Sequence, residues 1–341
     1  MPDSSSYPSR PQIAVFDTAA SSRNLGDLVI MDAVRRQLRK TVPEAFFVTV
    51  PTHDFLSIEG RKLVEQSALS IVGGTNLLCS QIQAYNQWKV RWRDTIWLKD
   101  VVLLGVGWWQ YQKPANRRTR IFQQRVLSHY LPHSLRDEYS ASQLRKSGFE
   151  NVLNTSCVTL WDIEPAVQQQ IPARKASSVV TTLTDYKPDP GKDGLMLEVL
   201  RRRYDEVLVW IQGAGDYAYI RELGVHGLTI VDPQLEAYDE VLQSSRDLDY
   251  IGTRLHAGVR AMLHRRRAMI LGVDNRATEI ARDIALPVME RDGSLESLEK
   301  WIDGENPTVL NLPWDKIDEW RQAIRTYLGL AALPPTSSQV T

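Results

Sequence analysis

The sequence predicts an α/β protein of two doubly wound domains that face each other across a cleft. Short β-branched runs alternate with longer helical stretches along the chain of 341 residues. Several runs are almost entirely apolar and end in glycine, which is typical of strands in a parallel sheet that helices cover on both faces. The alternation forms two series, separated near the middle of the chain by a segment containing Pro and Gln. Two series of this kind favour two domains with separate cores.

The first domain is expected over residues 12–165. Its predicted strands are 13–17, 46–50, 69–74 and 101–107, followed by a short strand that ends next to Arg136. A helix is expected over 26–40, because Ile30, Val34 and Leu38 fall on one face at helical spacing. A further helix follows Arg136 and stops at Gly148. Strands alternating with helices in this way indicate a parallel sheet.

The second domain is expected over residues 176–330, after the linker 164–178. Its predicted strands are 178–184, 206–213, 228–232, 248–253 and 267–273. The amphipathic helix 314–330 has the composition to fold back across the domains. The polar ends, 1–11 and 331–341, are expected to be flexible.

The charge balance argues against nucleic acid as a partner. Lys and Arg total 41 and Asp and Glu total 41, whereas nucleic-acid binders usually carry a basic excess. The arginine runs 201–203 and 265–267 lie where predicted helices end, which fits compensation of the helix dipole. The alternative for these runs is contact with anionic lipid, with peripheral association at the inner face of a membrane.

The chain lacks the sequence signs of a metal or disulfide protein. Its two cysteines, Cys79 and Cys157, form no CxxC, and its six histidines show no metal-ligand spacing. We therefore expect no metal and no cofactor. The first residues have no apolar signal segment, and no run of about 18 apolar residues predicts a membrane span. The expected location is the cytoplasm.

The main candidate site lies at the strand-to-helix junction that contains Arg254 and His256. Leu255 belongs to the apolar face of the following helix, and His256 lies about 100° round the axis from it. A helix start has unpaired N–H groups and a positive dipole end, so Arg254 is unfavourable there unless an anion binds. The junction therefore indicates a phosphate or carboxylate site. The alternative is that Arg254 pairs with a neighbouring carboxylate and His256 is a structural histidine.

Arg136 repeats this arrangement in the first domain. It follows a short predicted strand, and Asp137 is placed to cap the next helix. A guanidinium group binds a carboxylate or phosphate through two parallel hydrogen bonds. A structural ion pair is the alternative interpretation of Arg136.

Two loops of the first domain are candidates for contact with an acceptor or donor. One contains Asn24, Gly26 and Asp27, and helix capping alone would explain Asp27. The other is a glycine turn formed by Gly74, Thr75 and Asn76, whose polar groups suit a sugar or a carboxylate. An ordinary turn is the alternative there. In open α/β sheets, ligands bind beyond the carboxyl ends of the strands, where both loops are expected.

A dinucleotide fingerprint is present but weak. Gly213, Gly215 and Ala218 follow a predicted strand, and Asp232 ends the next one, as in G-x-G-x-x-G/A sites for NAD. The unit is not the first of its domain, and Gly224 shortens its helix. We do not expect NAD to bind.

The tryptophans between residues 88 and 109 are expected to pack in the core or at its rim, with stacking on an acceptor sugar as the alternative.

Taken together, the junctions resemble the polysaccharide pyruvyl transferase family. The matching pieces lie between about residues 13 and 290, and their order agrees with that of the family. They are NLGD, IVGGTNLL, LLGVGW, HSLRDEYS, NTSCVTLWDI, GTRLHAGVRAM and DNRATEIARD. Thr75 departs from the pattern, since many members have a third glycine there.

The resemblance implies two Rossmann-like domains arranged as in GT-B glycosyltransferases, with phosphoenolpyruvate as the donor. Members attach pyruvate as a cyclic ketal to a sugar of a polysaccharide, such as an exopolysaccharide, or of a lipid-linked glycan intermediate. The family motifs place Arg136, Arg254 and Leu255 at the donor and make His256 the general acid. The first domain would be the acceptor side and the second the donor side. The alternatives are a nucleotide-sugar glycosyltransferase of GT-B type and a carbohydrate-binding protein without catalysis.

Overall fold

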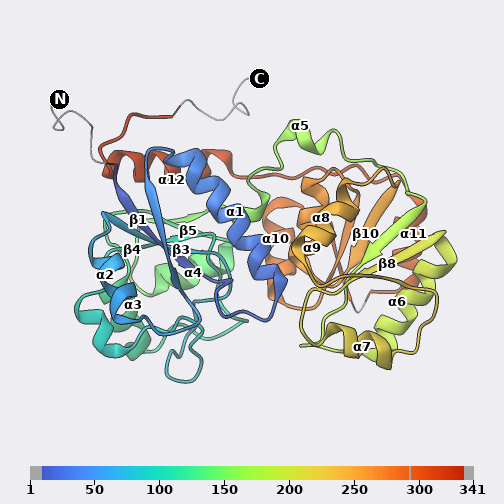
Figure 1. Ribbon diagram of the computed structural model, residues 1–341, viewed down its shortest axis with the longest axis horizontal. Coiled ribbons are helices and arrows are strands. Elements are labelled where there is room, and N and C mark those ends of the chain that lie inside the picture. The colour runs from blue at the N-terminus through green and yellow to red at the C-terminus, as the bar shows by residue number, and fades with distance from the viewer. Residues whose placement is uncertain (1–9, 292, 334–341) are drawn as a thin grey trace, which may run out of the picture.

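The computed structural model describes residues 10–291 and 293–333 and shows two α/β domains side by side (Figure 1). In the first, four parallel strands follow the order β2-β1-β3-β4, and a two-stranded sheet, β5-β6, is linked to it by the bridge Val106↔Leu135. In the second, six parallel strands follow the order β12-β11-β10-β7-β8-β9. The expected class of two doubly wound domains is confirmed.

The first domain alternates strands and helices from β1 onward. Its elements are β1 (Gln12–Asp17), α1 (Leu25–Thr41), β2 (Phe46–Pro51), α2 (Ile58–Glu65), β3 (Leu69–Gly73), η1 (Trp92–Ile96), β4 (Val101–Leu104), α3 (Arg117–Val126), β5 (His133–Leu135), α4 (Glu138–Lys146) and β6 (Val152–Asn154). The short turns η2 (Val158–Leu160) and α5 (Pro165–Gln168) lead to the second domain. Strands β3 and β4 end earlier than expected, because Gly74 and Gly105 have φ values of 59° and 64° that turn the chain out of the sheet.

The second domain has the same alternation. Its elements are β7 (Ser178–Thr181), α6 (Pro190–Arg203), β8 (Glu206–Trp210), α7 (Asp216–Glu222), β9 (Thr229–Val231), α8 (Leu235–Gln243), β10 (Leu248–Gly252), α9 (Leu255–Leu263), β11 (Ala268–Gly272), α10 (Asn275–Ile284), β12 (Val288–Glu290) and α11 (Leu295–Asp303). The chain then continues into the last helix, α12 (Trp314–Tyr327). The central strand β10 is buried at every position, as its apolar run predicts.

The last helix belongs to the core of the first domain. Ile317, Trp320 and Ile324 of α12 are fully buried in the cluster that contains Ile13 and Val15 of β1. In Figure 1, α12 lies over the first domain. The range 176–330 assigned this helix to the second domain and is wrong at that end, because the apolar face of α12 is buried by the first sheet. The expected flexible ends lie mostly outside the described residues.

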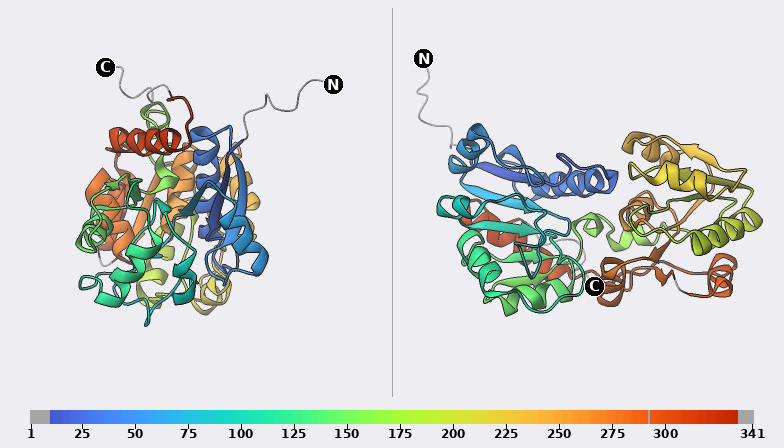
Figure 2. Two further views of the ribbon diagram at one scale, coloured as in Figure 1. Left: turned by 90° about the vertical axis from the view of Figure 1, so that its left-hand side faces the viewer. Right: turned by 90° about the horizontal axis from the view of Figure 1, so that it is seen from below.

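The two domains meet through the loops that follow β1 and β8. The backbone N–H of Leu25 donates to the carbonyl of Gln212 at 2.9 Å, and that of Ala214 donates to Arg23 at 3.2 Å. Helix α1 extends towards the second domain (Figure 2). Since both loops follow strand carboxyl ends, the ligand-binding edges of the two sheets face each other.

The arginine runs contact the protein itself. Arg202 and Arg203, in the last turn of α6, each lie 3.3 Å from Glu299 of α11. Arg267 is 1% exposed, and its guanidinium lies 4.0 Å from the centre of the Trp301 ring. Association with a membrane surface therefore stays a prediction. Within the described ranges, no helix has the length and apolar character needed to cross a membrane.

Candidate active site between the two domains

A cavity of about 540 Å³ lies between the facing sheet edges. The first domain contributes the expected loop residues Asn24, Asp27, Thr75 and Asn76, among others. The second domain contributes Tyr186 and the segment 274–276 at the start of α10. Gly26 and Gly74 lie in the same two loops and shape their turns. The rule that ligands bind beyond strand carboxyl ends thus identified both first-domain walls.

Arg136 is buried with part of its guanidinium unpaired. It is 1% exposed, its Nε donates to Asp137 at 3.0 Å, and its Nη2 has no hydrogen-bond partner among the described residues. Asp137 also caps α4, as expected, by accepting from the N–H of Ser140 at 2.6 Å. A Cβ on Gly107 would lie 2.1 Å from the Arg136 Cζ, so only glycine leaves room for this guanidinium. An unpaired buried N–H donor is costly, which makes Arg136 a ready anion contact.

His256 lies in the first turn of α9 and is 6% exposed. Its Nε2 is 3.8 Å from the Sγ of Cys157, in the loop before η2. Burial, and to a smaller extent the positive charges of Arg276 and Arg136, lower the pKa of His256 to about 3. An acid that works near pH 7 needs a pKa close to neutrality, and within the protein alone His256 lacks one, because two arginines and the apolar surroundings oppose a proton on the ring.

Arg254 is already paired with carboxylates of its own domain. Its guanidinium forms ion pairs with Asp216 and with Asp185, the latter at 3.1 Å, and its Nε donates to the carbonyl of Leu183. Pairing of Arg254 with a neighbouring carboxylate was the alternative to a bound anion in the sequence analysis. A donor contact through Arg254 would require these pairs to open. Leu255 packs in the core of the second domain.

Sequence reasoning missed Arg276 as a site residue. It is the second residue of α10 and lines the cavity. Its Nε donates to both carboxylate oxygens of Asp274, at 3.0 and 2.9 Å, and its Nη2 donates to the Tyr186 hydroxyl at 2.6 Å. Next to it, the Asn275 Nδ2 is buried without a partner in the described structure. The signal was present, since Arg276 follows a strand carboxyl end within DNRATEIARD.

Together these groups form a candidate anion site. Arg136 comes from the first domain, whereas His256, Asn275 and Arg276 come from the starts of α9 and α10. Both arginines act electrostatically on His256, so all three groups share one neighbourhood. Each guanidinium has a carboxylate partner, Asp137 for Arg136 and Asp274 for Arg276. Two helix N-termini, the Arg136 Nη2 and the Asn275 Nδ2 nevertheless leave donors that no described residue satisfies.

The first-domain wall of the cavity is aromatic and polar. The rings of Tyr85 and Trp109 are stacked with centroids 3.7 Å apart and an interplanar angle of 8°. Asp27 accepts from the Ser22 hydroxyl at 2.5 Å and lies 3.4 Å from the Thr75 hydroxyl. Burial raises the pKa of Asp27 above its ordinary value. Aromatic faces and a carboxylate are groups that suit a sugar, so this side of the cavity fits an acceptor.

The glycines of the dinucleotide fingerprint serve another purpose. A Cβ on Gly213 would lie 2.4 Å from the Arg254 Nη2, and a Cβ on Gly215 would lie 2.2 Å from a carboxylate oxygen of Asp185. The backbone space that a pyrophosphate needs is therefore filled by side chains of this chain.

Across the residues that the structure covers, His, Cys, Asp and Glu side chains form no group of three or more suited to a metal ion.

Two parallel-sheet domains with a ligand cavity between their carboxyl edges define a fold of GT-B type. Structures with this fold include the UDP-GlcNAc 2-epimerase of Methanocaldococcus jannaschii, with a TM-score of 0.54, 11% identity and coverage of 93% of this chain and 99% of that one. Another is S. aureus MnaA with UDP, with a TM-score of 0.50, 11% identity and coverage of 96% and 99%.

The family follows from the sequence match. The family model of the polysaccharide pyruvyl transferases matches residues 24–275, so the chain belongs to this family. The match includes Arg136, His256 and the first residue of α10. No curated protein matches the chain. The resemblance predicted from the strand-to-helix junctions is therefore confirmed.

Proposed function

We propose that the protein transfers the pyruvyl group of phosphoenolpyruvate to a sugar of a polysaccharide or of its lipid-linked precursor, forming a cyclic ketal and releasing phosphate. The observation that carries the proposal is the candidate anion site, in which Arg136 has an unpaired Nη2 and the charges of Arg136 and Arg276 both act on His256. Phosphoenolpyruvate is small and carries both a phosphate and a carboxylate, which matches the two guanidinium groups.

The reaction needs one proton donor and one proton acceptor. His256 would protonate the methylene carbon of the donor, which makes C2 electrophilic. One sugar hydroxyl then attacks C2, the C2–O bond to phosphate breaks, and a second hydroxyl closes the ketal. Two hydroxyl protons are lost, of which one replaces the proton delivered to the methyl group and the other leaves with phosphate.

Asp27 is our choice for the base that takes the proton of the attacking hydroxyl. It lines the same cavity as Arg276, together with the stacked Tyr85 and Trp109. Its pKa, raised by burial, makes its carboxylate a stronger base than an exposed aspartate. Ser22 and Thr75 fix the orientation of its carboxylate.

The second candidate is transfer of a sugar from a nucleotide sugar, since an epimerase with the same fold was solved with UDP-GlcNAc and UDP. The arginine cluster would then hold a diphosphate. Incubation with phosphoenolpyruvate and a candidate lipid-linked glycan, followed by mass spectrometry and phosphate measurement, tests the first proposal. Thermal shift with phosphoenolpyruvate and with nucleotide sugars separates the two, because only a ligand of the native state raises the midpoint.

A further inference from the structure

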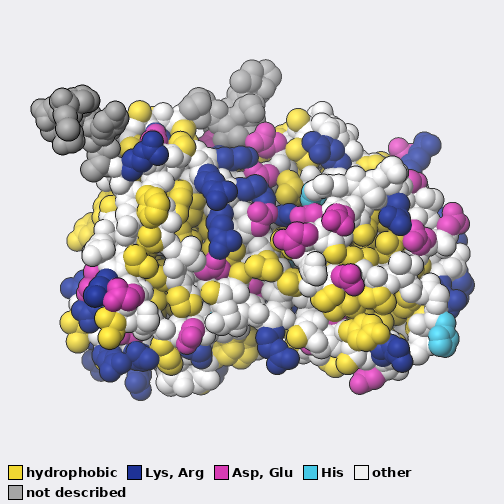
Figure 3. Space-filling view, in the orientation of Figure 1, with side chains coloured by type: hydrophobic (Ala, Val, Ile, Leu, Met, Phe, Trp, Pro, Cys, Tyr) yellow, Lys and Arg dark blue, Asp and Glu magenta, His cyan; other side chains and the backbone are white. Residues whose placement is uncertain are grey.

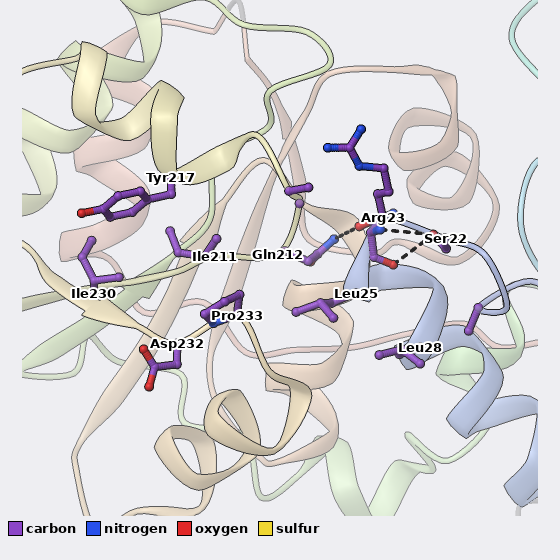
Figure 4. Close-up of a pocket in the computed structure, with 14 residues that line it drawn as sticks. Ser22, Arg23, Leu25, Leu28, Ile211, Gln212, Tyr217, Ile230, Asp232 and Pro233 are labelled. Atoms are coloured by element: carbon purple, nitrogen blue, oxygen red, sulfur yellow. Dashed lines mark hydrogen bonds between the residues drawn. The ribbon is translucent and has the colours of Figure 1, made fainter.

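A second cavity, of about 730 Å³, lies on the other side of the loop 22–24 (Figure 4). Tyr217, Ile211 and Ile230 form one side, and Leu25 and Leu28 form the other. Its volume is within the range of small-ligand pockets, about 300–1,000 Å³. The anion site described above uses none of these five residues.

Large apolar side chains are exposed at this pocket. Tyr217 is 48% exposed, Ile230 40% and Leu28 38%. In the space-filling view, hydrophobic side chains gather in the middle of the molecule, where α1 reaches the second domain (Figure 3). A cluster of this kind on a surface otherwise covered by polar groups marks a place where another molecule binds.

Three polar side chains of the pocket have unused hydrogen-bonding capacity. The Asp232 carboxylate and the Arg23 guanidinium have no hydrogen-bond or ion-pair partner among the described residues. Gln212, which is 3% exposed, has its Nε2 bonded to Asn24 at 2.9 Å, but its Oε1 accepts no hydrogen bond from any described residue. Two unused acceptors and a free tyrosine ring suit a sugar, which offers hydroxyl donors at its edge and C–H groups on its face.

The surroundings are unsuited to a diphosphate. The adjoining loop at Gly213 is occupied by Arg254, whose charge is balanced by Asp185 and Asp216. The backbone N–H of Gly213 already donates to Asp216 at 2.7 Å. A diphosphate would find this loop occupied and two carboxylates nearby, with the Arg23 guanidinium as its one cationic contact among the described lining residues, so a neutral sugar fits better.

The pocket and the candidate active site share a wall. Ser22, Arg23 and Asn24 line both cavities. An extended glycan that crosses this loop would place one sugar in each cavity. We propose that the second pocket binds a neutral sugar of the acceptor glycan, next to the sugar that receives pyruvate, with Tyr217 against the ring face and Asp232 accepting from its hydroxyls. This inference rests on the proposed function for the identity of the neighbouring sugar.

The test compares four proteins: wild type, Tyr217→Ala, Asp232→Asn and the control Tyr130→Ala. Tyr130 is 81% exposed and outside both cavities, so its loss controls for removal of a surface aromatic ring. Each protein is applied to an array of immobilised bacterial mono-, di- and trisaccharides, and its melting midpoint is measured with phosphoenolpyruvate, UDP and CDP. Wild type and Tyr130→Ala should bind di- and trisaccharides. The two pocket variants should bind them at least about tenfold more weakly, because each variant loses one charge-assisted or stacking contact.

Three results would overturn the inference. Wild type binds no saccharide, or the pocket variants bind like wild type, or UDP or CDP raises the midpoint of wild type but not of the pocket variants. All four proteins should keep their response to phosphoenolpyruvate. If phosphoenolpyruvate fails to raise the wild-type midpoint while saccharide binding still depends on Tyr217 and Asp232, the proposed donor is wrong and the sugar pocket stands.

Discussion

The most informative prediction concerns the proton on His256. At pH 7 the ring is neutral in the protein alone, since its pKa is lowered from 6.5 to about 3. Action as an acid near pH 7 requires the bound donor to raise that pKa by about four units, or about 5 kcal/mol. One negative charge about 4 Å away contributes about 4 kcal/mol at an effective dielectric constant near 20. A phosphate of about −1.5 to −2 charges, with a carboxylate beside it, is therefore sufficient.

Donor binding should accordingly be coupled to proton uptake. Titration calorimetry with phosphoenolpyruvate at pH 7, in buffers of different ionisation enthalpy, should show about one more proton taken up by wild type than by His256→Gln. His256→Gln should still bind the donor, yet transfer pyruvate about 10²–10⁴-fold more slowly, because an amide cannot deliver the proton. His256→Ala should behave in the same way.

The control is His226→Gln, which removes an exposed histidine far in sequence from the cavity. It should match wild type in proton uptake and in turnover. Wild-type turnover should fall as pH rises through the pKa of His256 in the donor complex. Equal proton uptake by wild type and His256→Gln, or near-wild-type turnover by that variant, would refute the role of His256 as acid.

Three further predictions address neighbouring residues. Arg136→Lys should weaken phosphoenolpyruvate binding by about 1.5–3 kcal/mol in calorimetry, because an ammonium cannot replace the guanidinium fork; unchanged affinity would move the donor elsewhere. Gly107→Ala should also weaken donor binding, since its Cβ would displace the Arg136 guanidinium, whereas Gly194→Ala, which meets nothing within 4 Å, should not. The native pKa of His256 is depressed, so its contribution to stability should be present above about pH 6.5 and be lost as pH falls towards 3. Between about pH 6.5 and about pH 3, the free energy of unfolding measured with urea should therefore fall less steeply with decreasing pH for His256→Gln than for wild type. Identical dependence on pH in the two proteins would contradict the burial of a neutral ring.

Much of the site was predictable because a simple rule connects sequence to position. Asp27, Thr75 and Arg136 each follow a strand of the first domain, and His256 follows a strand of the second. Parallel strands bring their carboxyl ends to one edge, so residues distant in sequence converge there. Arg276 obeys the same rule, but its sequence context alone did not distinguish it from other arginines at helix starts.

The ion-pair partners of Arg254 could not be predicted from the residues next to it in the sequence. Its position at a helix start indicated an anion, and the anions turned out to be Asp185 and Asp216. These carboxylates lie in loops about 70 and 40 residues earlier, which the order of strands in the second sheet brings beside Arg254. The G-x-G motif was misleading for the same reason, because it makes room for that guanidinium.

The sequence by itself determined the doubly wound class, the strand-to-helix junctions that carry the site, and the family. These depend on hydrophobic periodicity and on turn residues, which are properties of short segments. Only the tertiary structure decided that α12 packs on the first domain, that burial and two arginines keep His256 neutral, and that a second pocket adjoins the first across the loop 22–24. Those features depend on contacts between distant segments and on the way the two domains face each other, which no short segment encodes.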